Sequence, residues 1–335
     1  MCVLSVPEPA FLRWRHEPTG FGATVSVGIV LGAGGPLGWA YHLGVMQGVR
    51  DAIGREPANA DRVVGTSAGA AIAATLLAGT PTDQVLELIS SPPSDADREE
   101  LRSNGRRLWQ DPMRALRPVA PSLIRCVRHV GILTALAGLL PAGPFPTGMI
   151  RQFAATQEWP TPLWVPSVRL DDGRTVVFGR DLIPATLGDA LEATSAIPGV
   201  FQPKTIDGAR YVDGGVASST HAHTLVAEQL DVILISAPSA RNGGGPLRAR
   251  ARRSLNNENE SLRAGGSRTR ILIPDNLVLQ AAEGFPRKRP QAAADIVEAA
   301  RRQTVAAFKD LSSTSRSPQR PPGKLRRPPR PVSHP

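Results

Sequence analysis

A serine flanked by glycines is the first candidate for chemistry in this sequence. The segment Gly65-Thr66-Ser67-Ala68-Gly69 follows an apolar pair, Val63-Val64, and precedes a run of small residues from Ala70 to Ala78. This order predicts a strand, a sharp turn and a helix, with glycines where side chains would otherwise clash. The Ser67 hydroxyl would then lie at a helix N-terminus, which stabilises the anion formed during acyl transfer. By itself the pattern also fits a plain strand-to-helix turn, so other motifs must support the interpretation of Ser67 as a nucleophile.

A glycine-rich segment, Gly32–Gly38, lies between a β-prone run at 25–31 and a helical pattern at 39–53. The backbone N–H groups of such a turn bind an anion. A cofactor pyrophosphate is one candidate, but in a G-x-G-x-x-G pattern that starts at Gly32 the third glycine falls on Leu37, and the acidic Asp51 lies on the helix. The other candidate is the oxyanion of an acyl-transfer intermediate. We favour the oxyanion, because the next strand leads to Ser67.

A carboxylate is the candidate base for this serine, which needs a proton acceptor. Asp213-Gly214-Gly215 follows a predicted hairpin at 204–212, so the Asp213 carboxylate is expected at a strand end. By itself this motif is an ordinary tight turn. His221 and His223 follow it and leave a Ser-His arrangement open, whereas His42 is expected to be a helix residue near the site.

The elements that must position these residues alternate between strand and helix patterns, which predicts an α/β fold with a mostly parallel central sheet. Beyond the segments above, we expect a hairpin over 163–178, helices over 82–89, 187–196 and 290–311, a buried strand over 230–237 and a final strand over 270–274.

An amphipathic segment at 122–140 requires separate treatment. Its apolar residues recur at helical spacing: Leu123, Ile124, Val127, Val130, Leu133, Leu136 and Leu140. We favour a helix packed on the sheet, and a helix that lies on a lipid surface or covers the mouth of the site is the alternative.

Composition sets the domain organisation. The chain has 335 residues, of which 41% are hydrophobic. We expect an irregular lead-in at 1–24, one domain at 25–311 and a disordered Pro/Arg-rich tail at 312–335. The net charge is +10, and the tail carries six basic and no acidic residues. The tail is interpreted as a solubilising appendage or as a peripheral contact with anionic membranes, and nucleic-acid binding is not expected.

Targeting signals and cysteines suggest where the protein works. The N-terminal segment lacks the apolar core of a signal peptide, and no apolar run is long enough to span a membrane. The chain has two cysteines, Cys2 and Cys126, so a disulfide framework is not expected. We therefore expect a cytoplasmic protein.

Three separated blocks together resemble the patatin-like phospholipases, a family of lipid acyl hydrolases. They are the glycine-rich loop, the segment around Ser67 and the Asp213-Gly214-Gly215 motif, and the segment 193–203 also resembles the block upstream of the family's catalytic aspartate. The likeness runs from about Val27 to about Leu311. It implies a three-layer α/β/α sandwich with a nucleophile elbow, the strained strand-to-helix turn that presents a catalytic serine.

The resemblance also implies a mechanism that uses a Ser-Asp dyad and neither a metal nor a cofactor. Ser67 would attack a lipid ester, Asp213 would act as general base, and the N–H groups of Gly34 and Gly35 would bind the oxyanion. Further motif glycines support these groups: Gly32, Gly38, Gly65, Gly69, Gly214 and Gly215.

The chain departs from the family's Gly-Gly-Gly-x-Arg/Lys-Gly loop at Ala33, in place of the first glycine, and at Leu37, in place of the basic residue. A negative φ would make Ala33 tolerable. The loss of the basic residue leaves neutral esters and lysolipids open as substrates, so the implied activity is that of a phospholipase A, a lysophospholipase or a carboxylesterase. A conventional Ser-His esterase and a catalytically impaired lipid-binding protein of the same fold remain the alternatives.

Overall fold

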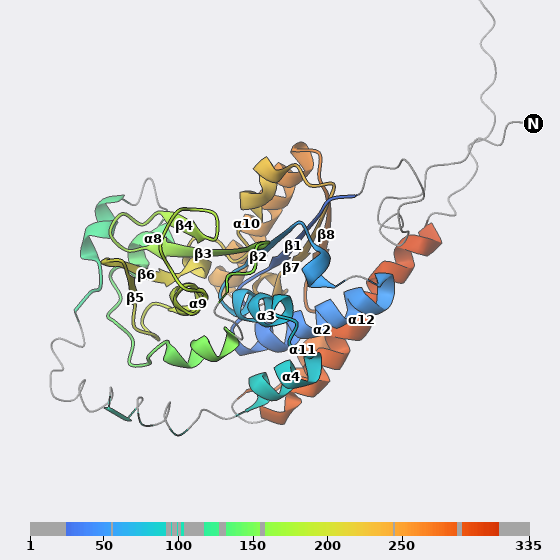
Figure 1. Cartoon of the computed structure of the whole chain (residues 1–335), viewed down its shortest axis with the longest axis horizontal. Helices are drawn as coiled ribbons and strands as arrows, with labels where there is room; N and C mark the ends of the chain where they lie inside the picture. The colour runs from blue at the N-terminus through green and yellow to red at the C-terminus, as the bar shows by residue number, and fades with distance from the viewer. Residues whose placement is uncertain are drawn as a thin grey trace, which may run out of the picture.

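The central feature of the fold is an eight-stranded sheet, seen near the middle of Figure 1. The computed structural model describes residues 25–54, 56–91, 95, 99, 102, 103, 117–126, 132–154, 158–243, 245–286 and 290–314. The predicted lead-in at 1–24 and residues 315–335 of the predicted tail lie outside this range.

The strand order along the sheet is β5-β6-β3-β2-β1-β7-β8, and β4 pairs with β3 off this path. The five strands from β3 to β8 along this order are parallel, whereas β4, β5 and β6 form the antiparallel part. The bounds are β1 (Val27–Leu31), β2 (Arg62–Gly65), β3 (Leu163–Arg169), β4 (Thr175–Phe178), β5 (Lys204–Ile206), β6 (Ala209–Asp213), β7 (Val232–Ser236) and β8 (Arg268–Leu272).

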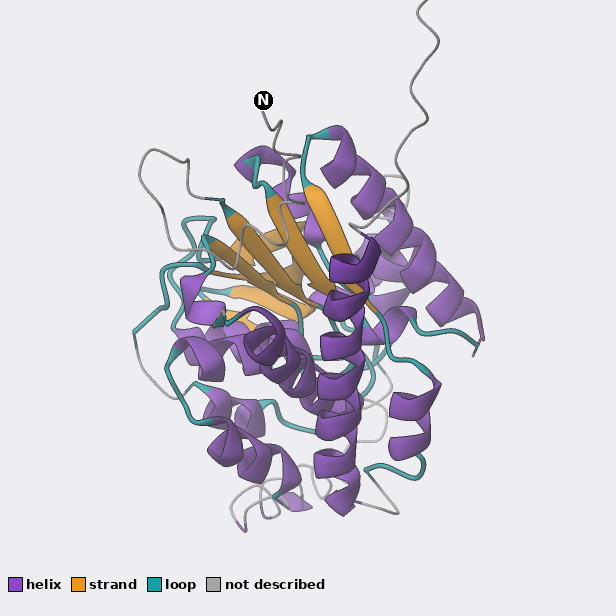
Figure 2. Ribbon diagram, turned by 90° about the vertical axis from the view of Figure 1, so that its right-hand side faces the viewer, coloured by secondary structure: helices purple, strands orange, loops and turns teal. Residues whose placement is uncertain are grey.

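Helices flank this sheet on both faces (Figure 2). The α-helices are α2 (Gly35–Ile53), α3 (Ala68–Leu77), α4 (Thr82–Ser90), α8 (Ile132–Ala137), α9 (Leu187–Ser195), α10 (Gly245–Ala264), α11 (Asn276–Ala281) and α12 (Ala293–Thr314). Short 3-10 helices cover Pro57–Asn59, Pro121–Cys126, Gly148–Phe153, Gly214–Val216, Ala222–Glu228, Pro238–Ala240 and Pro290–Ala292.

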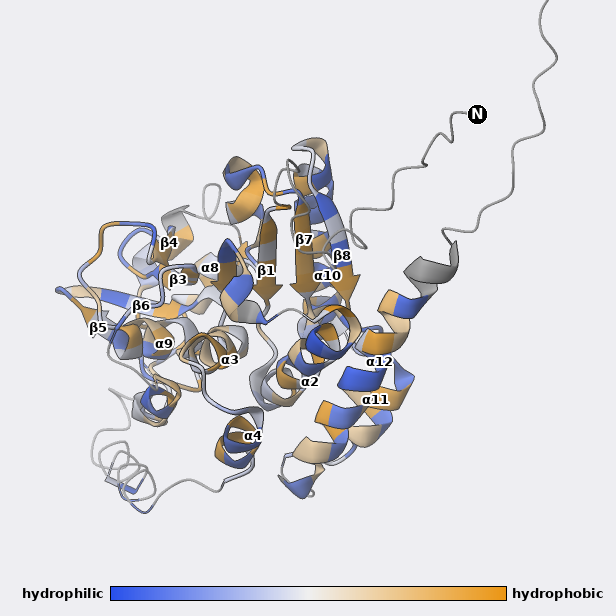
Figure 3. Ribbon diagram, turned by 45° about the vertical axis from the view of Figure 1, so that its right-hand side comes forward, coloured by the Kyte–Doolittle hydropathy of each residue, from blue (hydrophilic) through white to orange (hydrophobic). Residues whose placement is uncertain are grey.

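Alternating strand residues build a separate core on each face, because successive side chains of a strand point to opposite sides. Ile29 of β1 packs in one cluster with buried residues of α2, α3, α9 and α12. Its neighbour Val30 packs in the other cluster, with Leu255 and Leu262 of α10. Figure 3 shows β1 and β7 as hydrophobic strands and the surrounding helices as alternating hydrophilic and hydrophobic along their length. This arrangement confirms the predicted three-layer sandwich with a mostly parallel sheet.

Both predicted hairpins are present as antiparallel pairs, β3 with β4 and β5 with β6. The continuous helix predicted over 122–140 is not present in the described part of that segment. A 3-10 helix covers Pro121–Cys126 and α8 covers Ile132–Ala137, with residues 127–131 outside the description. The last helix, α12, continues to Thr314, three residues past the helix end predicted at Leu311. Among the described residues, no helix is both long and apolar enough to cross a membrane.

Candidate active site

Ser67 occupies a strained turn between β2 and α3. Its φ of 53° and ψ of −120° lie in a region that residues other than glycine rarely adopt. The turn is packed against β1, where a Cβ atom at Gly69 would collide with the Leu31 carbonyl oxygen. A side chain at Gly65, the last residue of β2, would meet the backbone of Ala70 at 2.5 Å. The predicted nucleophile elbow geometry is therefore present at Ser67, and its glycines permit the close approach.

Thr194 of α9 holds this turn from the opposite side. The Ser67 backbone N–H donates to Thr194 Oγ1 over 3.1 Å, and the Thr194 hydroxyl donates to the Pro166 carbonyl of β3 over 2.5 Å. The Thr194 side chain is fully buried. In the sequence, Thr194 lies in the block that resembles the family but has no assigned role. A polar residue beside the apolar face of a predicted helix is the signal that could have identified it.

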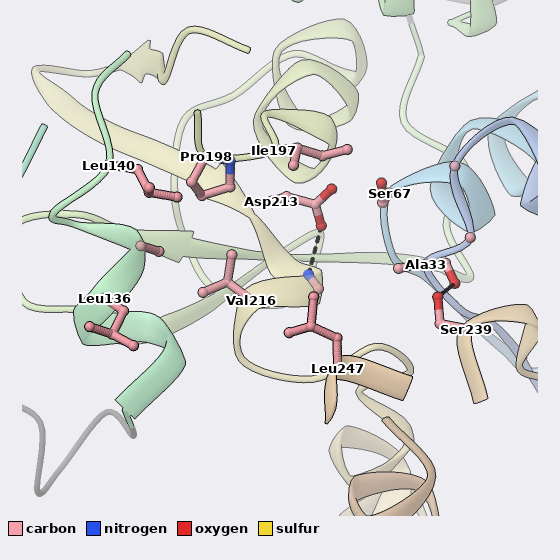
Figure 4. Close-up of a pocket in the computed structure, with 14 residues that line it drawn as sticks. Ala33, Ser67, Leu136, Leu140, Ile197, Pro198, Asp213, Val216, Ser239 and Leu247 are labelled. Carbon is pink, nitrogen blue, oxygen red and sulfur yellow. Dashed lines mark hydrogen bonds between the residues drawn. The ribbon is translucent and has the colours of Figure 1, made fainter. Parts of the chain in front are cut away.

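Asp213 lies at the end of β6, opposite Ser167 of β3, and shares a pocket with Ser67 (Figure 4). Its backbone N–H donates to Ala196 O over 2.9 Å, and its Oδ1 accepts a hydrogen bond from the Gly215 N–H at 2.7 Å. Burial raises the pKa of the Asp213 carboxyl to about 6, although the Ser67 hydroxyl and the Gly215 N–H favour the charged form. A carboxyl with this pKa is largely charged at neutral pH, so it can accept a proton.

The glycine-rich loop runs from β1 into α2 beside Ser67. The Gly32 N–H donates to Ser236 O over 2.9 Å, and the Ala33 N–H donates to Ser219 O over 2.7 Å. These two donors are therefore engaged. Gly34 caps α2 and Gly35 is its first residue, a position at which backbone N–H groups have no partner inside the helix. Gly34 and Gly35 thus present backbone donors at the pocket wall.

Two features of the loop explain its glycines and the departure at Ala33. Gly35 has a φ of +57°, which favours glycine, and a Cβ atom at Gly34 would lie 2.6 Å from Pro238 Cγ. Ala33 is not among the residues with positive φ, so the condition set for this substitution is met. Leu37, at the position of the family's basic residue, is partly buried and packs against the larger hydrophobic core.

His42 of α2 holds the glycine-rich loop through a hydrogen bond, and its contacts do not place it as a base for Ser67. Its Nε2 donates to the Gly32 carbonyl over 2.7 Å, and its Nδ1 lies 2.8 Å from Ser236 Oγ. Burial lowers the pKa of His42 to about 4, against the hydrogen bond to Gly32, so the ring is neutral at pH 7. Since a carbonyl only accepts, Nε2 carries the proton and Nδ1 accepts from the Ser236 hydroxyl.

The other two histidines also have partners other than Ser67 and Asp213. His221 is fully buried, with Nδ1 3.2 Å from Thr66 Oγ1, and burial lowers its pKa to about 3. His223 Nδ1 lies 3.2 Å from Glu258 Oε1. Within the described part of the chain, no hydrogen bond joins either ring to Ser67 or Asp213.

The remaining motif glycines lie behind the pocket or beside the aspartate. A Cβ atom at Gly32 would lie 2.8 Å from Ser219 O, and one at Gly38 would lie 3.0 Å from Ala68 Cβ, so the loop, its helix and the turn pack closely. Gly214, the residue after Asp213, is packed just as closely, since a Cβ atom there would lie 2.5 Å from Pro166 O. These glycines therefore set backbone distances around the site.

The pocket itself has a volume of about 420 Å³. Ser67, Asp213, Gly34, Gly35 and Gly215 line one part of it. Apolar side chains line the rest, and Figure 4 shows them facing the same space: Leu136, Leu140, Ile197, Pro198, Val216 and Leu247. Among the described residues, no cluster of three or more His, Cys, Asp or Glu residues is arranged to hold a metal ion.

Similarity to solved structures is broad but distant. VipD from Legionella pneumophila is 15% identical, with a TM-score of 0.43 over 86% of this chain and 68% of that chain. The type III effector protein ExoU is 19% identical, with a TM-score of 0.41 over 88% of this chain and 54% of that chain.

Curated relatives in sequence come from mycobacteria. An uncharacterized NTE family protein of Mycobacterium bovis and two of Mycobacterium tuberculosis are each 27% identical over 215 residues. The match covers 63% of this chain and 47% of each relative, so it spans about half the length of those proteins.

A family model described as patatin-like phospholipase matches residues 29–226, which is more than half of the chain. The matched range begins in β1 and includes the glycine-rich loop, the Ser67 turn and the Asp213 motif. This chain belongs to the patatin-like phospholipase family.

Proposed function

We propose that this protein is a serine acyl hydrolase that cleaves lipid ester bonds through an acyl-enzyme formed on Ser67. The observation that carries the proposal is the shared pocket: a serine on a strained turn and a buried carboxyl line one cavity with apolar walls. Such a cavity suits an acyl chain, with its few polar groups at the reacting end.

In the first step, the Ser67 hydroxyl attacks the ester carbonyl carbon and Asp213 takes its proton. The pKa of about 6 suits this role, because the carboxyl is charged at neutral pH yet basic enough to hold a proton. The hydrogen bond from the Gly215 N–H to Oδ1 fixes the carboxylate as this happens.

The tetrahedral intermediate places negative charge on the former carbonyl oxygen. The backbone N–H groups of Gly34 and Gly35 supply the oxyanion hole, aided by the positive N-terminus of α2. A donor of this kind contributes roughly 3 kcal/mol to transition-state stabilisation in other hydrolases.

The intermediate collapses when the bond to the alcohol breaks, and Asp213 returns its proton to the leaving oxygen. Water then attacks the acyl-enzyme and gives a proton to Asp213, which returns it to the Ser67 oxygen as the bond to the acyl group breaks and the acid is released. Phospholipids, lysolipids and neutral esters are all candidate substrates, and the apolar Leu37 at the family's basic position keeps neutral esters among them.

Hydrolysis of acyl esters by Ser67→Ala tests the proposal. Chromogenic esters of increasing chain length and a panel of phospholipids, lysolipids and neutral glycerides serve as substrates. The variant is expected to lose nearly all turnover, while Ser261→Ala, at an exposed serine of α10, keeps wild-type rates. Full activity in Ser67→Ala would contradict the proposal. Lipid binding by the wild type without turnover would favour a catalytically impaired lipid-binding protein.

A conventional Ser-His mechanism is tested by replacing His221 and His223 together with Asn. The dyad mechanism predicts that the folded double variant still forms the acyl-enzyme, because neither ring is hydrogen-bonded to Ser67 in the described part of the chain. Loss of acylation with a native thermal transition and with Ala33 amide exchange as slow as in the wild type would instead assign the base role to a histidine.

A further inference from the structure

Glu258 of α10 is a buried carboxylate outside the catalytic pocket with an unusually large set of hydrogen-bond donors. It accepts from the Ser218 and Thr220 hydroxyls over 2.5 Å each and from the Ala222 N–H over 2.8 Å. His223 Nδ1 lies 3.2 Å and Ser254 Oγ 3.3 Å from Oε1. Glu258 itself is 6% exposed. All but Ser254 of these partners lie in one short segment, residues 218–223, which follows the Asp213 motif.

The charge of Glu258 is retained despite its burial. Burial opposes the charged form, but hydrogen bonds from His223, Ser218 and Thr220 outweigh it and lower the pKa of Glu258 to about 2. Hydrogen bonds to a charged acceptor are stronger than neutral ones. A buried charge would be costly if its donors moved away, so the carboxylate and the segment stabilise each other.

The segment 218–223 in turn contacts the elements that carry the proposed catalytic groups. Ser219 O accepts the Ala33 N–H at 2.7 Å, next to the proposed oxyanion donors. His221 Nδ1 lies 3.2 Å from the hydroxyl of Thr66, the residue before Ser67. His221 Cε1 also lies 3.2 Å from the position of a Cβ atom at Gly214, the residue after Asp213.

We propose that Glu258 is a positioning residue for the proposed acyl-transfer reaction. Its carboxylate holds the segment 218–223 on α10, and that segment fixes the glycine-rich loop through Ala33 and the nucleophile turn through Thr66. This inference rests on the proposed function for its effect on turnover, but its effect on the loop is independent of catalysis. Glu258 touches no substrate, so its role differs from that of Ser67 or Asp213.

Glu258→Gln tests the positioning role with little change in shape. The NH2 group of Gln is a hydrogen-bond donor. It cannot accept the hydrogen bonds that the carboxylate accepts at this site, such as the one from the Ala222 N–H. The expected result is a fall in kcat of about tenfold or more with KM changed less than threefold, because substrate binding uses the apolar pocket walls and the oxyanion hole acts in the transition state. Amide hydrogen exchange in a peptide that includes Ala33 is expected to accelerate, while exchange in β7 stays unchanged.

Two variants on the same helix serve as controls. Glu260→Gln changes an exposed carboxylate two residues away and is expected to match the wild type. Leu262→Ala removes a fully buried side chain from the α10 core, so it lowers stability while the Glu258 carboxylate and its hydrogen-bond donors are kept. It is expected to keep wild-type kcat and Ala33 exchange at temperatures where it is folded. If Glu258→Gln fails to fold, Thr220→Val removes a single hydrogen bond and is expected to show the same changes to a smaller degree.

The outcomes separate this inference from the proposed function. Glu258→Gln with wild-type kcat, or with loop exchange no faster than in Leu262→Ala, would overturn the positioning role while leaving the hydrolase intact. A wild-type protein without turnover would contradict the proposed function, and the exchange of the Ala33 amide would still decide whether Glu258 holds the loop.

Discussion

Replacing Asp213 with Asn is expected to stabilise the folded protein while abolishing turnover. The Asp213 carboxyl is 5% exposed, and burial raises its pKa to about 6 from the ordinary 3.8. A raised folded-state pKa means that the charged form is disfavoured by folding. The wild type therefore loses stability as the pH rises from about 4 through 6.

The size of the effect follows from the difference in pKa. At 1.36 kcal/mol for each pKa unit, the charged Asp213 costs the folded state about 3 kcal/mol at pH 8. An Asn side chain keeps an oxygen that accepts from the Gly215 N–H and carries no charge. A gain of 1–3 kcal/mol corresponds to a rise of roughly 2–10 °C in Tm for a protein of this size.

Thermal and urea unfolding of both proteins at pH 4, 6 and 8 measure this effect. The stability difference is expected to be largest at pH 8 and to vanish near pH 4, where Asp213 is protonated. Asp207→Asn is the matched control, because Asp207 is an exposed aspartate in the β5–β6 turn with a φ of 47°, which Asn tolerates. A difference that is independent of pH, or an Asp213→Asn protein less stable than the wild type at pH 8, would refute the burial argument.

Two further predictions concern rate and packing. The value of kcat/KM is expected to rise with pH through about 6 and then level, because Asp213 must be charged to accept the Ser67 proton, and a pH–rate profile that is flat from 5 to 8 would contradict it. Gly69→Ala is expected to cost roughly 1–3 kcal/mol of stability and to lower kcat, because the new methyl group collides with the Leu31 carbonyl, whereas Gly265→Ala, with ordinary contacts, is its control in urea unfolding and ester assays.

The main elements of the fold could be predicted from local patterns. Apolar runs bounded by turns located β1, β7 and both hairpins, and helical spacing located α9 and α12. The 122–140 segment shows the limit of periodicity. Its apolar spacing fits one helix, yet the described residues form a 3-10 helix and then α8, with Leu123 buried and Ile132 exposed. Tertiary contacts decide such boundaries, and a single sequence does not contain them.

Part of the site could also be predicted from local patterns. Glycines mark tight turns and close approach, so the loop, the Ser67 turn and the Asp213 motif were recognisable before their arrangement was known. Thr194 and Glu258 were not assigned, because each acts through partners distant in sequence, Ser67 and the segment 218–223 respectively. Local sequence patterns do not predict hydrogen bonds between residues that lie far apart in the sequence.

The central claim, that Ser67 and Asp213 act together, is tested most directly by labelling with a fluorophosphonate serine probe. The adduct is located by mass spectrometry in the wild type and in Asp213→Asn at pH 8. We expect a single active-site adduct on Ser67 in the wild type and at least a hundredfold slower labelling in Asp213→Asn. Absence of an adduct on Ser67, or labelling at an equal rate in both proteins, would contradict the account.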